Sequence, residues 1–154
     1  MHEWDTDEYR AAQRAAYEAI KARHPDLVTR GFGCYAGWLP ILARFFDTVA
    51  EVLADAPGVG FQLSQVKEKF GGLRIYYVVP RRPLPRTLDT QAVREADAHR
   101  KISEAYERAE QEANRTCDVC GKAGVLRVRN GWFATRCEEH ADGTVPVAPK
   151  GEMG

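Results

Sequence analysis

Three cysteines and one histidine near the end of the chain have the spacing of metal ligands. Cys117 and Cys120 form a C-x2-C pair, and Cys137 and His140 form a C-x2-H pair. Zn2+ prefers four soft or borderline ligands in a tetrahedron, and two short loops joined by a hairpin supply such a set. The alternatives are a redox-active pair at the first two cysteines or four unrelated residues. We interpret the pattern as a site for one structural Zn2+, because four protein ligands leave no open coordination position.

The segment between the two pairs, VLRVRNGWFATR, has the pattern of a β-hairpin. Asn130-Gly131 between strand-forming residues predicts a two-residue type I′ turn, in which Arg129 pairs with Trp132. One face is apolar and is expected to dock on the rest of the protein. It holds Leu126, Val128, Phe133 and Thr135. The other face has arginines around one aromatic ring, which suits phosphate contacts and base stacking. It holds Arg127, Arg129, Trp132 and Arg136.

Residues 65–77, QVKEKFGGLRIYY, predict a second hairpin with strands at about 60–69 and 73–79 and Gly71-Gly72 as its turn. In this register Lys69 lies opposite Arg74, and like charges in that position destabilise a strand pair by roughly 0.2–1 kcal/mol. Lys67 shares the same face, so we expect this face to meet something negative. The other face is apolar apart from Glu68, whose burial requires a hydrogen-bonding partner.

Two explanations of these basic faces stay open. In the first, both faces bind an anion, with nucleic acid as the candidate partner. In the second, the arginines neutralise a Cys3His zinc centre of net charge −1, and the lysine-bearing face pairs with an acidic helix or is simply solvated. The chain has 22 basic and 22 acidic residues. This balance favours the second explanation, because dedicated nucleic-acid-binding domains usually have a pI above about 9.

Three helices are predicted, at about 5–22, 39–55 and 89–114. In the first helix, Asp5 as N-cap and Glu8 at N3 form a capping box, and Trp4 packs on Tyr9. The inward residues of this helix are expected to be Tyr9, Ala12, Ala16 and Ile20. Those of the third helix are expected to be Val93, Ala96, Ala105, Tyr106, Ala109 and Ala113.

These elements predict an α+β fold in which the three helices pack on an antiparallel hairpin sheet, followed by a Cys3His zinc ribbon. The expected division is an α+β body over 1–114, the zinc ribbon packed on it over 115–141, and a disordered tail over 142–154. Cys34 lies apart from the ligand pairs, and we expect it to be a buried, unreactive thiol.

Several of these segments together resemble a family of small, uncharacterised zinc-ribbon-containing proteins of bacteria and bacteriophages. The matching residues are Cys34, Gly37-Trp38, QVKEKFGGLRIYY, CDVCGKAG, Arg127, Gly131-Trp132, Thr135, Cys137 and His140. The resemblance covers most of residues 31–141, and the chain departs from it at Ala36 and Pro40. It implies the architecture described above and brings no activity with it.

The composition points away from membranes and from catalysis. No apolar run approaches the length of about 20 residues that spans a bilayer, and the acidic N-terminus is unlike a signal peptide, so a cytoplasmic protein is expected. His2, His24 and His99 are scattered, and GxSxG, HExxH and phosphate-loop motifs are absent from the sequence. We therefore expect a non-enzymatic, zinc-binding accessory protein without a small-molecule substrate, for which nucleic acid is a candidate partner. The alternative is an adaptor or inhibitor that contacts only protein.

Overall fold

The computed structural model describes residues 2–80 and 90–147. Within these residues the fold is α+β, as the sequence predicts, with three α-helices and two small sheets. The helices are α1 (Asp7–Arg23), α2 (Leu39–Ala54) and α3 (Thr90–Ala113), and the short 3-10 helix η1 spans Ala36–Trp38. The strands are β1 (Phe32–Gly33), β2 (Gln62–Lys69), β3 (Gly72–Val78), β4 (Val125–Arg129), β5 (Trp132–Arg136) and β6 (Val145–Pro146).

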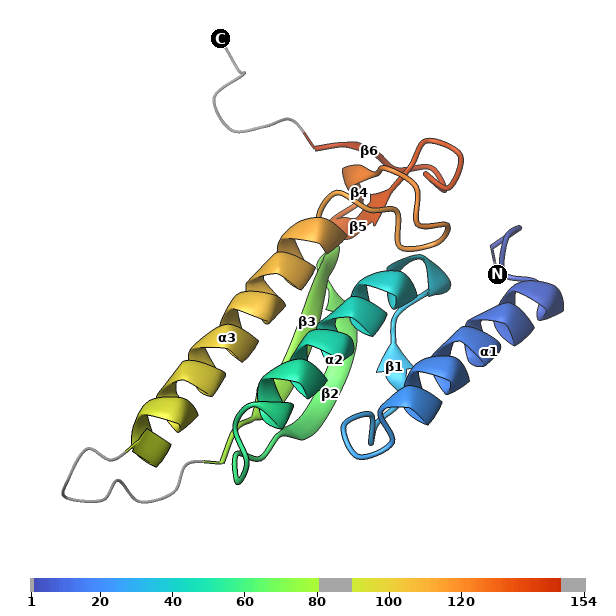
Figure 1. Ribbon diagram of the computed structural model, residues 1–154. Helices are drawn as coiled ribbons and strands as arrows, with labels where there is room; N and C mark the ends of the chain where they lie inside the picture. Colours follow the sequence, from blue (N-terminus) through green and yellow to red (C-terminus); the bar gives the residue numbers. More distant parts are fainter. Residues whose placement is uncertain (1, 81–89, 148–154) are drawn as a thin grey trace, which may run out of the picture.

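The first sheet has the strand order β1-β2-β3, and α2 and α3 lie side by side against one of its faces (Figure 1). Unlike the predicted hairpin sheet, it is mixed, because β1 runs parallel to β2. The core lies between this face and the helices, where Trp38, Leu42, Phe46, Leu73 and Ile102 are fully buried. No helix within the described residues is long and apolar enough to cross a membrane.

The tip of the β2–β3 hairpin differs from the prediction. Its turn residues are Phe70 and Gly71, with φ of 53° and 85°, and Lys69 pairs with Gly72. Positive φ at both central residues is the requirement of a type I′ turn. Gly72 instead lies in β3, where an added Cβ would sit 3.0 Å from the guanidinium of Arg74.

This shift of the register moves the pairings of Gln65–Lys69 by two residues, and an irregularity between Leu63 and Gln65 adds one more beyond it. Because side chains alternate with a period of two, the residues from Gln65 to Lys69 keep their predicted faces. The cross-strand partner of Arg74 is Lys67 rather than Lys69. Phe70, predicted to pair with Leu73, is at the tip instead and is 70% exposed.

The start of α1 also differs by one residue from the prediction. Thr6 is the N-cap, and its hydroxyl oxygen accepts a hydrogen bond from the Tyr9 backbone N–H at 3.1 Å. Asp5, predicted as the cap, instead pairs with Arg10 at 2.7 Å. A hydroxyl can replace a carboxylate as a cap because either oxygen satisfies one exposed N–H group of the first turn. Trp4 packs edge-on against Tyr9 with ring centroids 5.1 Å apart, which agrees with the prediction.

The inward faces of two helices are confirmed only in part, since Tyr9 and Ile20 of α1 and Ala105, Ala109 and Ala113 of α3 face inward as predicted. In α1, Ala12 and Ala16 are exposed, and Gln13 and Tyr17 lie between the inward Tyr9 and Ile20. Tyr9, Gln13, Tyr17 and Ile20 follow an i, i+4 and i, i+3 spacing, which places them on one side of the helix. In α3 the buried residues are Ala92, Ala98, Ile102, Ala105, Ala109 and Ala113, whereas Val93 is 58% exposed and Ala96 is exposed.

The C-terminal hairpin has the predicted register, with Arg129 opposite Trp132 and Asn130 at a φ of 50°. A part of the predicted disordered tail is ordered, because β6 pairs antiparallel with β4 and places Val145 opposite Val128. The strand edge of β4 supplies the unpaired backbone groups that make this addition favourable. Residues 148–154 of the predicted tail lie outside the described residues.

Candidate metal centre

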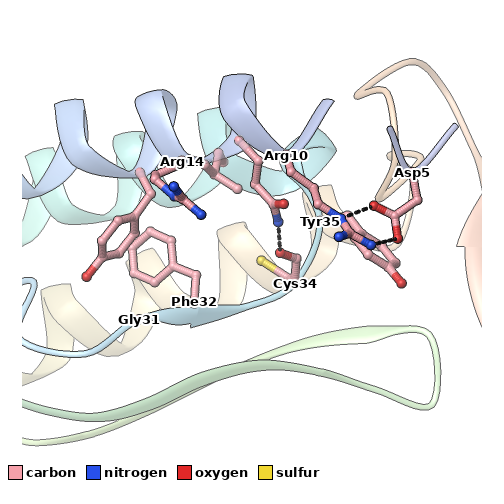
Figure 2. A pocket seen from close by; sticks show the side chains of 10 residues that line it. Asp5, Arg10, Arg14, Gly31, Phe32, Cys34 and Tyr35 are labelled. Carbon is pink, nitrogen blue, oxygen red and sulfur yellow. Dashed lines mark hydrogen bonds and ion pairs between the residues drawn. The ribbon is translucent and has the colours of Figure 1, made fainter. Parts of the chain in front are cut away.

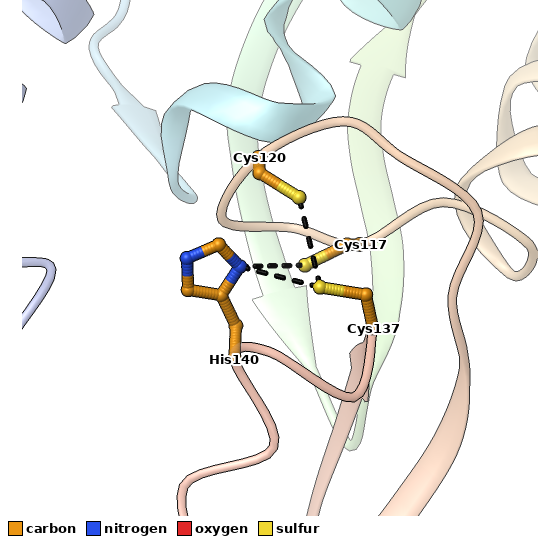
Figure 3. Close-up of side chains that lie close together, drawn as sticks. All are labelled: Cys117, Cys120, Cys137 and His140. Carbon is orange, nitrogen blue, oxygen red and sulfur yellow. Dashed lines mark hydrogen bonds between the residues drawn. The ribbon is translucent and has the colours of Figure 1, made fainter.

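The four predicted ligands lie together at the end of the molecule where the β2–β3 hairpin has its turn (Figure 3). One ligand atom from each residue lies within 4.8 Å of the others. The sulfurs of Cys120 and Cys137 are 3.7 Å apart, and the His140 Nδ1 atom is 3.8 Å from the Cys117 sulfur and 3.3 Å from that of Cys137. The cluster can therefore hold a metal ion.

Three of the six separations within the cluster are close to those of a tetrahedral site, and all six are within 4.8 Å. Zn–S bonds of about 2.3 Å and Zn–N bonds of about 2.0–2.1 Å place two sulfurs about 3.8 Å apart and a sulfur and a nitrogen about 3.6 Å apart. The observed distances of 3.3–3.8 Å bracket those values. Three thiols and one imidazole nitrogen are also the ligand types that zinc prefers.

Two tight turns bring the ligands together. In the first knuckle, residues 117–121, the Gly121 N–H donates to the Cys117 carbonyl at 2.9 Å while Gly121 adopts a φ of 81°. In the second knuckle, residues 137–140, the His140 N–H donates to the Cys137 carbonyl at 3.3 Å. Because a positive φ favours glycine, this turn requires a glycine directly after Cys120.

The first knuckle and the preceding Thr116 are bonded to the helical body by three hydrogen bonds, two from η1 and one from α1. The Gly37 N–H donates to the Asp118 carbonyl at 2.8 Å, and the Trp38 indole N–H donates to the Thr116 carbonyl at 2.9 Å. The Tyr9 hydroxyl donates to the Val119 carbonyl at 2.7 Å. These bonds couple the position of the cluster to α1 and η1.

The surroundings of the thiols shift their pKa values in different directions. Burial raises the pKa of Cys120 to about 11. Desolvation opposes ionisation of Cys137 as well, but hydrogen bonds from the His140 N–H and from neighbouring thiols outweigh it and lower its pKa. Cys34, outside the cluster, is 8% exposed, and burial raises its pKa to about 12. It is thus the buried thiol that the sequence predicts, and it stays protonated at neutral pH.

Arg136 was predicted to lie on an exposed basic face, and this is wrong. Its side chain is 1% exposed, and its Nε donates to the Asp118 carboxylate at 3.0 Å. The guanidinium carbon lies 5.5, 5.7 and 5.1 Å from the ring centroids of Trp4, Tyr35 and Trp132. Burial raises the pKa of Asp118 to about 6, against the attraction of the guanidinium. The N-terminal segment covers this face, which the hairpin pattern alone could not indicate.

Arg127 is also buried, at 8% exposure, and donates to the carbonyls of Arg136 and Thr144. Only Arg129 and Trp132 of the predicted C-terminal basic face are exposed, the latter by 43%.

The predicted docking face is correct only in part. Thr135 is buried and donates to the Gly71 carbonyl at 2.6 Å, but Leu126 is 38% exposed.

The lysine-bearing face of the first hairpin divides into two parts. Arg74 pairs with Glu110 of α3 at 3.4 Å, as the internal explanation predicts. Lys67 and Lys69 form no ion pair within residues 2–80 and 90–147. Their ammonium groups instead lie 5.6 Å from the Tyr76 ring and 5.7 Å from the Phe70 ring.

Sequence reasoning missed three cavities that meet at Tyr35. The first, of about 410 Å3, lies between α1 and the chain before η1, where Arg10 pairs with Asp5 and the Gln13 amide donates to the Cys34 carbonyl at 2.8 Å (Figure 2). A second of about 400 Å3 and a third of about 450 Å3 both have Trp132 in their walls. The residues around Tyr35 gave no signal of a cavity, because the walls of each cavity come from segments far apart in the sequence.

No protein-family model, curated protein or solved structure matches this chain. The resemblance to bacterial and phage zinc-ribbon proteins therefore stays a hypothesis, and the function rests on the geometry of the residues themselves.

Proposed function

We propose that Cys117, Cys120, Cys137 and His140 bind one Zn2+ ion with a structural role. The observation that carries this proposal is that three sulfurs and one nitrogen lie within 4.8 Å of one another, with three of their separations, 3.3–3.8 Å, close to those of a tetrahedral shell. Four protein ligands complete that shell, so the metal has no position at which to activate water.

The role of this zinc is to join the C-terminal hairpin to the helices. The first knuckle bonds to the body through Tyr9, Gly37 and Trp38, so fixing its shape fixes those contacts. Structural zinc sites in small peptides contribute about 10–16 kcal/mol of apparent binding free energy, which acts as folding free energy.

Metal analysis of the purified protein tests this proposal. We expect about one zinc per chain, and we expect Cys137→Ser to lose it and to unfold at a much lower temperature. Cys34→Ser is the matched control, because Cys34 lies outside the cluster, and it should keep the metal. Less than half an equivalent of zinc in the parent, or a Cys137→Ser variant of unchanged stability, would refute the proposal.

We further propose that the protein binds single-stranded nucleic acid through a lysine–aromatic face, defined as Lys67, Lys69, Phe70 and Tyr76. The two lysines lie beside exposed rings, 70% exposed in Phe70 and 40% in Tyr76. Single-strand binding uses this combination, because bases stack on aromatic rings while cations contact phosphates.

The φ of 53° at Phe70 adds support. A bulky residue in the left-handed region costs about 1–2 kcal/mol, and such strain concentrates at functional sites. The competing occupant of this face is a protein, which the same exposed rings could contact.

Binding of a fluorescent single-stranded oligonucleotide at 50–200 mM salt separates these occupants. Lys67→Gln with Lys69→Gln should weaken binding and reduce the slope of log K against log[salt] by about 1.4, or about 0.7 for each lost phosphate contact. Lys21→Gln with Lys122→Gln removes the same charge from other exposed positions and should change little. Absence of binding by the parent, or equal loss in both double variants, would refute the nucleic-acid proposal.

A further inference from the structure

Two of the four proposed zinc ligands form a pair of sulfurs on the solvent side of the cluster. Cys120 is exposed and Cys137 is partly exposed, and the contact between their sulfurs, at 3.7 Å, is open to solvent (Figure 3). Cys117 is 0% exposed, and its sulfur lies against His140 in a partly buried contact. A soluble oxidant can therefore approach the first pair of sulfurs but not that of Cys117.

The separation of these two sulfurs suits a disulfide. An S–S bond is about 2.03–2.05 Å long, so the sulfurs of Cys120 and Cys137 have to approach each other by about 1.7 Å. Both are bound as thiolates in a zinc site, and the thiolate is also the form of cysteine that acts as a nucleophile. Oxidation-sensitive cysteines combine exposure with a second cysteine nearby, which reacts with the first oxidation product. The pair has both properties.

We propose that Cys120 is an oxidation site and that Cys137 resolves it, so that a hydroperoxide converts the pair to a disulfide and releases the metal. This inference rests on the proposed structural zinc and adds a means of regulating that site. It is independent of the lysine–aromatic face.

The reaction has two steps. The Cys120 thiolate attacks one oxygen of hydrogen peroxide, the O–O bond breaks, and Cys120 becomes a sulfenic acid while hydroxide leaves. The Cys137 thiolate then attacks the Cys120 sulfur, which forms the S–S bond and expels a second hydroxide. Each hydroxide takes up a proton, so two thiolates, one peroxide and two protons give one disulfide and two water molecules. The two sulfurs lose the two electrons that the peroxide gains.

The disulfide removes two of the four ligands. Cys117 and His140 alone do not complete a tetrahedral shell, so the metal is lost. The carbonyls of Asp118 and Val119, which accept hydrogen bonds from η1 and α1, lie in the same turn as Cys117. A single cross-link stabilises a protein less than a structural zinc site does, so the oxidised protein should have a lower Tm than the zinc-loaded one.

Treatment of the full-length, zinc-loaded protein with a molar excess of hydrogen peroxide tests the proposal. A chromogenic zinc chelator follows the release of metal, and untreated protein with the same chelator is the baseline. We expect one zinc to be released for each disulfide that forms. Dithiothreitol followed by added zinc should restore both the metal content and the Tm, because a disulfide is reversible. Release of zinc without a disulfide would overturn the proposal.

Peptide mapping of the alkylated, oxidised protein identifies the bond. Trypsin leaves Cys117 and Cys120 together on the peptide 116–122 and places Cys137 at the start of another peptide. The expected disulfide links these two peptides, and fragmentation of the linked pair shows which of the first two cysteines is attached. A disulfide that contains Cys117, or one that contains Cys34, would overturn the assignment.

Cys120→His separates loss of the thiol from loss of a ligand. Imidazole is also a zinc ligand and the position is exposed, so the variant should keep its zinc and release it to peroxide at least about tenfold more slowly. Cys34→Ser, which lies outside the cluster, is the matched control and should release zinc at the rate of the parent. A Cys120→His variant that binds zinc and releases it as fast as the parent would overturn the proposal. If this variant does not bind zinc, the peptide map of the parent decides.

Failure of this inference is distinguishable from failure of the zinc proposal. Zinc that is present in the untreated parent and stays bound after peroxide treatment would overturn the oxidation site and leave the structural role intact. Untreated parent with less than half an equivalent of zinc would reject both.

Discussion

Replacement of Tyr9 by phenylalanine measures how strongly the first knuckle is held by α1. The Tyr9 hydroxyl donates to the Val119 carbonyl at 2.7 Å and accepts the Ala36 N–H at 2.9 Å. Phenylalanine keeps the ring against Trp4 and removes only the oxygen. The change therefore isolates two hydrogen bonds that join α1, η1 and the knuckle.

The magnitude follows from those two bonds. Each neutral intramolecular hydrogen bond contributes about 0.5–1.5 kcal/mol, so the variant should lose about 1–3 kcal/mol of unfolding free energy. For a chain of this length, about 2–4 °C of Tm is lost for each kcal/mol, which gives a decrease of about 2–12 °C. Tyr17→Phe is the control, because its hydroxyl makes one exposed bond to the Arg30 carbonyl and should contribute less.

The same substitution should change the alkaline stability of the protein. Burial raises the pKa of Tyr9 to about 12, whereas in the unfolded chain it is about 10. Between these values the folded state binds a proton that the unfolded state has lost, so this contribution is complete below pH 10 and is lost as pH rises toward 12. The advantage of the parent over Tyr9→Phe should therefore shrink between pH 9 and pH 11. The other tyrosines are present in both proteins and cancel.

Urea denaturation of the zinc-saturated proteins at pH 8, 9, 10 and 11 provides the measurement. A difference below about 0.5 kcal/mol at pH 8 would mean that the two bonds do not hold the knuckle. A difference that stays constant up to pH 11 would contradict the burial of the hydroxyl.

Three further changes have definite expected outcomes. Gly37→Ala places a Cβ against the backbone of the first knuckle, so urea denaturation should show a loss of about 3 kcal/mol of unfolding free energy, together with weaker zinc retention. In the control Gly31→Ala the added Cβ meets nothing within 4 Å, and the unfolding free energy should not change. Phe70→Asn relieves the φ of 53° and should raise Tm by about 2–4 °C while weakening oligonucleotide binding; a lower Tm would contradict the strain. Asp47→Asn removes a carboxylate whose pKa is lowered chiefly by a hydrogen bond with His24. The substitution should therefore destabilise the protein at pH 6, and this effect should disappear as the pH falls below about 4. An equal loss of stability at both pH values would contradict that linkage.

The sequence was most informative where the signal was local. The spacing of the cysteines and the histidine placed the four ligands together, because a tight knuckle turn is determined within five residues. Asn130-Gly131 determined the β4–β5 register, since both residues tolerate the left-handed conformation that a type I′ turn needs. In the first hairpin the same rule misled, because Phe70, a residue rarely found in that conformation, occupies the turn.

The errors arose where a face was assigned from its own pattern. Arg136 alternates with Thr135 along β5, so the strand face predicted for Arg136 was correct. Its burial, however, depends on Trp4 and Tyr35, which are distant in sequence. Asp118, which pairs with it, had no motif of its own. The second cavity, of about 400 Å3, is built from five segments and leaves no periodic signal in any one of them, so it could be found only in the folded chain.

The bond between α1 and the first knuckle also affects how the protein can be synthesised. Tyr9 and Val119 are 110 residues apart in the chain. At a translation rate of about 5–20 residues per second, the helix waits roughly 6–22 seconds for the partner of its first turn to be made. During that interval α1 can pack only on segments already made, such as η1 and α2, so its first turn completes its contacts late although it is among the first parts of the chain to be translated.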